Sequence, residues 1–256
     1  MLKNLFLMAL ATLCLQNNSW ANGNEEVYMR DPLESDRFSF PQPNTSDLGQ
    51  ELKLWATYYY TPEMSDETGD VPLRDKAGDI LGPMFSKKDW CTVALEGSVR
   101  VKSKSGLDHI TYNYAGTTTD YKVSCKEYFK FDVSKTKFMK AVGPWGDGLP
   151  QQYVLSPFRT IATDLTYIKP GTVLFIPQAR GAKITLPNGK IIFHDGYFFA
   201  GDKGGAIKGS HIDVFIGINH SAPYFPWIKS KDTGVFNAYI VKDQNIISEL
   251  TAQHAQ

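Results

Sequence analysis

Two aspartates in the C-terminal half have the spacing and the neighbours of a general acid site. In the segment 194–217 (HDGYFFAGDKGGAIKGSHIDVFIG), strand alternation places Asp213 on the same face as Phe215. A carboxyl group beside an aromatic surface loses solvation and its pKa rises, which suits a general acid near neutral pH. The glycines between Asp202 and Asp213 allow the chain to fold back, so that both acids could line one cleft. The same spacing also fits a plain turn, with Asp202 capping the turn and Asp213 in solvent.

The elements that must position these acids are predicted to be short strands. Apolar or aromatic runs bounded by turn residues indicate a mainly β fold, which favours a barrel or a sandwich. Residues 187–189 (PNG) and 102–108 have the composition of turns. A helix is expected only in the tail after Asp243 and for about one turn around 206–207. The predicted strands are 52–60, 90–101, 109–115, 171–177, 182–186, 190–193, 196–200, 211–217 and 235–241.

The N-terminus indicates an exported protein. A charged residue at position 3, a short apolar run and a small residue at each of positions 19 and 21 are typical of a cleaved signal peptide over 1–21. Cys14 follows the bulky Leu13, whereas a lipid-attachment motif needs a small residue before its cysteine. The protein is therefore expected to be periplasmic or secreted and not lipid-anchored. In an oxidising compartment, Cys91 and Cys125 are expected to form a disulfide. Residues 22–50 are polar and interrupted by prolines, which predicts a flexible leader.

Charge and composition exclude some partners. The 27 basic and 27 acidic residues give a formal net charge of zero. This balance argues against nucleic acid or an anionic membrane surface as the main partner. Between residues 143 and 150, three glycines and two prolines predict a loop, read either as a linker or as a cleft rim on which Trp145 offers a flat face to a sugar ring.

The aspartate pattern resembles that of a known family. Residues 202–217 read D-x-G-G-A-I-K-G-x-x-I-D-V-F-x-G, which resembles the signature of the three-aspartate (3D) domain found in lytic transglycosylases of the MltA type. Residues 158–177 resemble the family segment in which Ala-x-Asp precedes Pro-Gly-Thr, and they supply Asp164 as the remaining aspartate. Residues 55–62 (WATYYYTP) resemble the family's opening strand.

The resemblance implies a double-psi β-barrel with an inserted β-rich second domain that forms the other cleft wall. The barrel would comprise 51–62 and 151–241, the insertion 63–150, and a C-terminal tail 242–256. The implied activity is cleavage of the MurNAc-β-1,4-GlcNAc bond of peptidoglycan with formation of 1,6-anhydro-MurNAc. Asp213 would be the acid and base, and Asp202 and Asp164 would position hydroxyl groups or stabilise positive charge. Groove residues would be Thr57, Tyr59, Trp145, Gly204, Gly205 and Lys208.

Two alternatives come from other functional classes. His194, Asp202, His211 and Asp213 could form a zinc site of a cell-wall peptidase, although their spacing matches no zinc motif. A binding module that keeps the groove without catalysis is the other alternative. The lytic transglycosylase interpretation predicts that the protein needs no cofactor or metal and binds glycan strands. It also predicts a monomer that is not inserted in a membrane after signal cleavage.

Overall fold

The computed structural model describes residues 38–66, 68–102, 108–151, 153–186, 189–218 and 224–256. The predicted signal peptide, the leader up to residue 37 and the central residues of the two predicted turns lie outside these ranges. Within them, no helix combines the length and the apolar character needed to cross a membrane.

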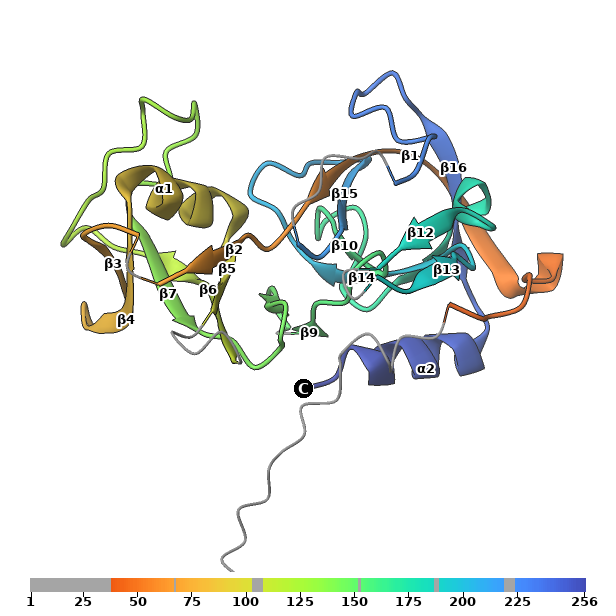
Figure 1. Cartoon of the computed structure of the whole chain (residues 1–256). Coiled ribbons are helices and arrows are strands. Elements are labelled where there is room, and N and C mark those ends of the chain that lie inside the picture. Colours follow the sequence, from red (N-terminus) through yellow and green to blue (C-terminus); the bar gives the residue numbers. More distant parts are fainter. Residues whose placement is uncertain (1–37, 67, 103–107, 152, 187–188, 219–223) are drawn as a thin grey trace, which may run out of the picture.

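Six strands from distant parts of the chain close into a barrel (Figure 1). Their order is β1-β15-β10-β14-β11-β16, and the pairs β1–β15 and β10–β14 are parallel while the others are antiparallel. This is the double-psi β-barrel that the motifs imply. The strands are β1 (Leu48–Tyr59), β10 (Thr160–Ala162), β11 (Val173–Phe175), β14 (Tyr197–Asp202), β15 (His211–Phe215) and β16 (Phe236–Val241). The predicted hairpin is present as β12 (Lys183–Thr185) and β13 (Ile191–Phe193).

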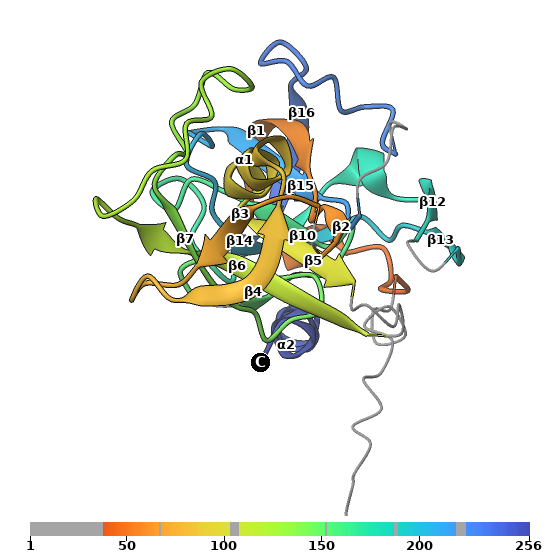
Figure 2. The ribbon, with the colours of Figure 1, turned by 60° about the vertical axis from the view of Figure 1, so that its left-hand side comes forward.

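A second β-rich region stands beside the barrel in Figure 1 and comes to the front of it in Figure 2, and it has a core of its own around Trp90 and Phe138. It contains a sheet in the order β2-β5-β6-β7 and a hairpin of β3 and β4. The sheet strands are β2 (Glu63–Ser65), β5 (Ser98–Lys102), β6 (His109–Thr117) and β7 (Thr136–Lys140); the hairpin is β3 (Val71–Arg74) and β4 (Ile80–Phe85). The pair β8 (Asp147–Gly148) and β9 (Tyr153–Val154) leads back to the barrel.

The predicted strand over 90–101 is wrong in its first half. Residues Lys87–Glu96 form helix α1, and the strand β5 begins only at Ser98. The Ser86 hydroxyl accepts a hydrogen bond from the Asp89 N–H at the helix start, and Gly97 ends the helix with a φ of 80°. The apolar residues of this segment pack at helical spacing into the core of the inserted region, and a short apolar segment of this kind does not by itself distinguish a helix from a strand.

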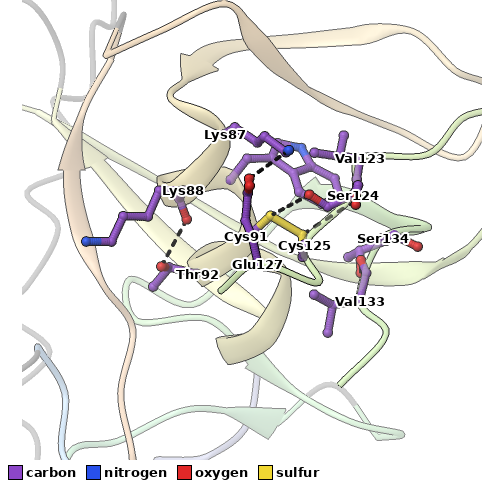
Figure 3. The surroundings of a disulfide bond; sticks show 12 residues. Lys87, Lys88, Cys91, Thr92, Val123, Ser124, Cys125, Glu127, Val133 and Ser134 are labelled. Atoms are coloured by element: carbon purple, nitrogen blue, oxygen red, sulfur yellow. Dashed lines mark hydrogen bonds and ion pairs between the residues drawn. A yellow bond between two sulfur atoms is a disulfide. The ribbon is translucent and has the colours of Figure 1, made fainter. Parts of the chain in front are cut away.

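The disulfide between Cys91 and Cys125 is confirmed (Figure 3). It joins α1 to the long connection between β6 and β7, and the Lys87–Glu127 ion pair of 2.7 Å lies beside it. The helix that carries this bond also supplies one wall of the cleft described below.

Both ends of the described chain are docked on the barrel. The prediction of a flexible leader up to residue 50 is wrong for residues 38–50, because Phe40 is buried against Tyr197 and its N–H donates to Asp195. The helix expected in the tail is α2 (Gln244–Gln253), capped by the Asp243 side chain. His254, the residue after this helix, is buried, and its Nε2 lies 3.0 Å from the hydroxyl oxygen of Thr160.

Candidate active site between the barrel and the inserted region

Strand register brings the two predicted acids onto neighbouring strands. Ala162 of β10 pairs with Asp213 of β15 on one side and with Asp202 of β14 on the other. Since Ala162 has a single methyl group, it leaves room between the two carboxyl groups. The parallel pairing of β1 with β15 places Thr57 directly beside Asp213.

These acids open onto a cavity of about 380 Å³ that has one wall from each region. The barrel contributes both acids, the glycine-rich loop between them and two tyrosines. The inserted region contributes the end of α1 and part of the β6–β7 connection. The lining residues are Tyr58, Tyr59, Ala162, Asp202, Lys203, Gly204, Gly205, Ala206, Ile207 and Asp213 from the barrel, and Leu95, Glu96, Phe131 and Val133 from the insertion.

Asp213 is the end of a short hydrogen-bonded chain. The Thr57 hydroxyl donates to Asp213 Oδ1 at 2.7 Å and lies 2.8 Å from Nε2 of His211. Because the hydroxyl has one hydrogen, His211 is then the donor to Thr57. His211 is stacked on Trp55 with ring centroids 3.6 Å apart, and burial lowers its pKa, so the neutral ring is favoured.

The environment of Asp213 keeps both the protonated acid and the carboxylate populated near neutral pH. Burial raises the pKa of Asp213 to about 7; the hydrogen bond from Thr57 opposes this rise, and the negative charge of Asp202 adds to it. The side chain is enclosed by protein yet keeps some surface toward the cavity. A carboxyl group of this kind can both donate and accept a proton at neutral pH.

Asp202 is held by backbone donors at the same cavity. Its Oδ1 accepts from the N–H groups of Leu149 and Lys203, both at 2.8 Å. Burial raises the pKa of Asp202 to about 6, and these two N–H groups limit the rise. A Cβ on Gly148 would clash with the carbonyl oxygen of Gly201, so the approach that brings Leu149 to Asp202 requires glycine.

Tyr59 faces both acids. Its hydroxyl is buried; it makes no hydrogen bond of good geometry with a described residue, yet a hydrogen-bonding interaction with Asp202 contributes to the pKa of both groups. Burial, and then the negative charges of Asp202 and Asp213, raise the pKa of Tyr59 well above its usual value. The hydroxyl therefore stays neutral beside Asp202.

Glu96 is a cleft residue that the sequence analysis missed. It is the last residue of α1 and lines the insertion wall. Burial raises the pKa of Glu96 to about 7; a hydrogen bond from the Tyr60 N–H opposes this, and the charge of Asp213 adds to it. Because the sequence predicts a strand over residues 90–101, no feature of the sequence places the Glu96 carboxyl group near the aspartates.

The structure does not bring all of the predicted site residues together. Gly204 and Gly205 line the cavity, whereas Lys208 and Asp164 are not among the lining residues. The Asp164 carboxylate accepts hydrogen bonds from the Gly209 N–H at 2.9 Å and from the N–H and hydroxyl of Thr166. These bonds lower the pKa of Asp164 to about 2 and tie two loops together.

The prediction that Trp145 stacks on a sugar is wrong. Trp145 is only 4% exposed and packs in the barrel core, with the guanidinium group of Arg100 over its ring at 4.5 Å. The glycines around it fold the 143–150 loop inward, so the ring fills the junction between the two regions instead of lining a rim.

The geometry gives no support to the zinc alternative. His194 is 1% exposed, its Nε2 lies 2.8 Å from the Phe158 carbonyl oxygen, and its Nδ1 accepts from the Gly196 N–H. Burial lowers the pKa of His194 to about 3, and both ring nitrogens are occupied. In the described ranges, no group of three or more His, Cys, Asp or Glu side chains is arranged to hold a metal ion.

A barrel that carries two half-buried aspartates and is interrupted by a second β-rich region defines a known class of fold. Residues 159–231 match the family model described as the 3D domain. A comparison with curated protein sequences gives no significant match. The chain therefore contains a 3D domain, as its aspartate motif predicts.

Several solved structures that resemble it are lytic transglycosylases. MltA from E. coli with bound chitohexaose is 18% identical, covering 74% of this chain and 72% of that one with a TM-score of 0.51. MltA from Neisseria gonorrhoeae is 16% identical, with coverages of 76% and 74% and a TM-score of 0.50. The membrane-bound lytic murein transglycosylase from Agrobacterium tumefaciens is 14% identical, with coverages of 77% and 75% and a TM-score of 0.50. At these identities the comparison shows that the chain has the MltA-type fold.

Proposed function

We propose that this protein is a peptidoglycan lytic transglycosylase with Asp213 as its acid and base. The observation that carries the proposal is the position of Asp213 in the cavity together with its pKa of about 7. The fold shared with lytic transglycosylases supports it, and one of those proteins, from E. coli, holds a chitohexaose.

The proposed reaction needs one carboxyl group in two roles. Protonated Asp213 donates its proton to the glycosidic oxygen as the bond to the MurNAc anomeric carbon breaks. The resulting carboxylate then accepts the proton of the C6 hydroxyl, whose oxygen bonds to that carbon and closes the 1,6-anhydro ring. The acid is regenerated, no water is consumed, and no cofactor is needed. A pKa near the working pH suits both proton transfers.

The neighbours of Asp213 support this division of roles. Asp202 has the lower pKa, so at neutral pH it carries the negative charge that stabilises a developing positive charge at the anomeric carbon. The neutral Tyr59 hydroxyl lies beside Asp202 and favours its charged form. Thr57, with His211 behind it, orients the Asp213 carboxyl group. Asp164 and Lys208 act, in this proposal, through the loop that they hold.

The remaining assignments are part of the same proposal. The barrel (51–62 and 151–241) provides the chemistry, the insertion (63–150) provides the second wall, and 242–256 forms the docked tail. The substrate is the glycan strand, bound in the cleft by a monomeric protein in the periplasm or outside the cell after removal of residues 1–21.

Mass spectrometry of the products formed from purified peptidoglycan tests this function. Muropeptides ending in 1,6-anhydro-MurNAc are expected. Products with reducing ends would instead identify a hydrolase, cut peptides a peptidase, and unchanged peptidoglycan a binding module. Activity is expected to persist in EDTA; loss of activity that zinc restores would contradict the carboxylate mechanism.

One observation favours a second candidate, a hydrolase with two carboxyl groups. Glu96 lines the wall that faces the barrel and has a raised pKa like that of Asp213. Two carboxyl groups on opposite sides of a glycosidic bond are the usual arrangement for hydrolysis. In that mechanism, Glu96 would activate water or form a glycosyl intermediate, and the products would carry reducing ends.

A further inference from the structure

A second cavity, of about 400 Å³, lies wholly within the inserted region. It is bordered by the β3–β4 hairpin, by the start of the β6–β7 connection and by Lys137 of β7. None of its lining residues belongs to the cleft that holds Asp213. Its lining is Val71, Pro72, Arg74, Ala77, Gly78, Asp120, Tyr121, Val123 and Lys137.

Lys137 is an unusual residue for such a position. It is only 2% exposed, and the described residues offer its ammonium group no hydrogen bond and no ion pair. Nζ lies 5.0 Å from the centre of the Tyr121 ring, and a Cβ on Gly78 would be 3.9 Å from it. Nζ is not one of the fully enclosed unpaired polar atoms of the described residues, so it keeps some surface toward the cavity. The cation–π contact offsets only part of the hydration that the ammonium group loses.

Arg74 brings a second cation to the same ring. Its guanidinium carbon is 5.8 Å from the centre of Tyr121, and one N–H group donates to the Gly78 carbonyl at 2.7 Å. The ring itself is fixed, since the Tyr121 hydroxyl donates to the carbonyl of Thr136 and Trp90 packs edge-on against the ring. Two cations are thus held in place around one cavity.

Asp120 is the acidic residue of this lining, and it does not neutralise the two cations. Its carboxylate is exposed and accepts hydrogen bonds from the hydroxyl groups of Thr118 and Thr119. The ion pairs between described residues include none from Asp120 to Lys137 or to Arg74. The cavity therefore keeps a net positive charge with a negative group at its edge.

We propose that this cavity is a binding site for a carboxylate group. Lys137 supplies a point charge, and Arg74 supplies further N–H donors in a planar fork that matches a carboxylate. A monoanion fits better than a phosphate dianion because the second charge would be repelled by Asp120. Within the proposed function, the source is a stem-peptide carboxylate of the peptidoglycan whose glycan lies in the cleft; the free alternative is a small soluble carboxylate.

The site can be tested by NMR titration of the full chain with acetate, with inorganic phosphate, with a muropeptide carrying free carboxylates and with the same muropeptide amidated. Acetate and the free-carboxylate muropeptide are expected to shift the amide signals of Gly78 and Tyr121, and the amidated muropeptide is expected not to. Shifts with acetate but not with the free muropeptide would assign the site to a small soluble carboxylate. Stronger binding of phosphate than of acetate, or no shift with any of them, would overturn the proposal.

Lys137→Met is the decisive variant, with Lys140→Met as its matched control because Lys140 is exposed on the same strand. Lys137→Met is expected to weaken carboxylate binding about ten-fold or more, the scale of one charge-assisted hydrogen bond. Without ligand its Tm is expected to stay close to that of the parent, since the methionine keeps the apolar part of the side chain and the removed ammonium group makes no ion pair. If Lys137→Met does not fold, Arg74→Gln serves as the second variant.

Unchanged binding in the folded Lys137→Met variant, or in Arg74→Gln where that variant serves, would overturn the assignment. Chitohexaose, which carries no carboxylate, is expected to bind the parent and both lysine variants equally. Glycan cleavage is measured separately, so a chain that binds acetate here but releases no anhydro products would keep this site and lose the proposed function.

Discussion

The barrel wall and the inserted wall of the cleft hold their carboxyl groups in different ways. Asp213 and Asp202 are fixed by strand register, with Ala162 paired to both. Glu96 stands at the end of a helix that is tied down by a disulfide one turn away. Asp213 has a side-chain hydrogen bond from Thr57, whereas Glu96 accepts from the backbone of the barrel segment at Tyr60.

This difference suggests that the two regions have different roles in catalysis and in substrate binding. Strand pairing fixes the backbone of each aspartate, so the position of its carboxyl group relative to a bound sugar varies little. The inserted wall has its own hydrophobic core and its own disulfide, so its shape can change without a change in the structure of the barrel. We therefore expect the barrel wall to determine the chemistry and the inserted wall to determine which glycan binds.

The largest expected effect separates the two walls directly. Asp213→Asn removes the proton that the mechanism needs, so the rate of anhydro-muropeptide release is expected to fall about 10²–10⁴-fold or more. Glu96→Gln keeps the hydrogen bond from Tyr60 and is expected to lower the rate by less than about ten-fold. Both rates are measured on purified peptidoglycan with product analysis by mass spectrometry.

Folded protein is essential to that comparison. The melting transition of each variant is the control, and glycan binding is expected to survive in Asp213→Asn because the cleft keeps its shape. A large loss of rate in Glu96→Gln together with reducing-end products would transfer the function to the two-carboxylate hydrolase. Near-parental release by Asp213→Asn would remove the central assignment and make Asp202 the next candidate.

The disulfide provides the next largest effect. The Cys91–Cys125 bond closes a loop with a sequence separation of 34, and loss of such a cross-link typically costs about 2–4 kcal/mol. The double variant Cys91→Ser/Cys125→Ser is therefore expected to unfold at lower denaturant concentration, with hydrogen exchange increasing in α1 and β5–β7 before the barrel strands. Equal loss of protection in both regions would show that the inserted region does not unfold separately.

The pH dependence of the rate tests the hydrogen bonds and charges around Asp213. The acid must be protonated to donate, so the rate is expected to fall as pH rises through the Asp213 pKa of about 7. Thr57→Val removes a bond that stabilises the carboxylate, so the falling limb should move to higher pH. Asp202→Asn removes a negative charge that stabilises the acid form, so the limb should move to lower pH. Shifts of roughly one unit, about 1.4 kcal/mol, are expected.

Thr57→Ser is the matched control, since it retains the hydroxyl and should retain the parental profile. Shifts in the same direction for Thr57→Val and Asp202→Asn would mean that the limb reports another group. Glu96, whose pKa is also about 7, is then the group to examine through the profile of Glu96→Gln.

The sequence predicted the barrel wall well because its information is local. The acids, the glycines and the alternation that puts Asp213 beside Phe215 lie within one motif, and burial raises the pKa of Asp213 as that alternation predicts. The inserted wall depends on contacts between distant residues, and the run that contains Glu96 was assigned to the wrong element. The prediction that Trp145 lines the cleft is wrong for a related reason. The sequence of a glycine-rich loop does not show whether its aromatic residue faces solvent or the core.

Asp164 gives the smallest expected effect and tests whether the barrel wall includes all three aspartates. Its two oxygens accept from different loops, so Asp164→Asn turns one oxygen into an NH₂ group that faces the Gly209 N–H. The rate is expected to fall less than about ten-fold, below the range of a lost acid or base, and Tm is expected to fall slightly.

The hydrogen bonds that lower the Asp164 pKa to about 2 contribute stability above the unfolded pKa near 4, and this contribution is lost as pH falls through 2. The Tm difference from the parent should therefore shrink between pH 5 and pH 2, while Asp232→Asn, an exposed control, should show none. A hundred-fold loss of rate at unchanged Tm would instead place Asp164 at the reacting sugar, and the barrel wall would then act with three carboxyl groups instead of two.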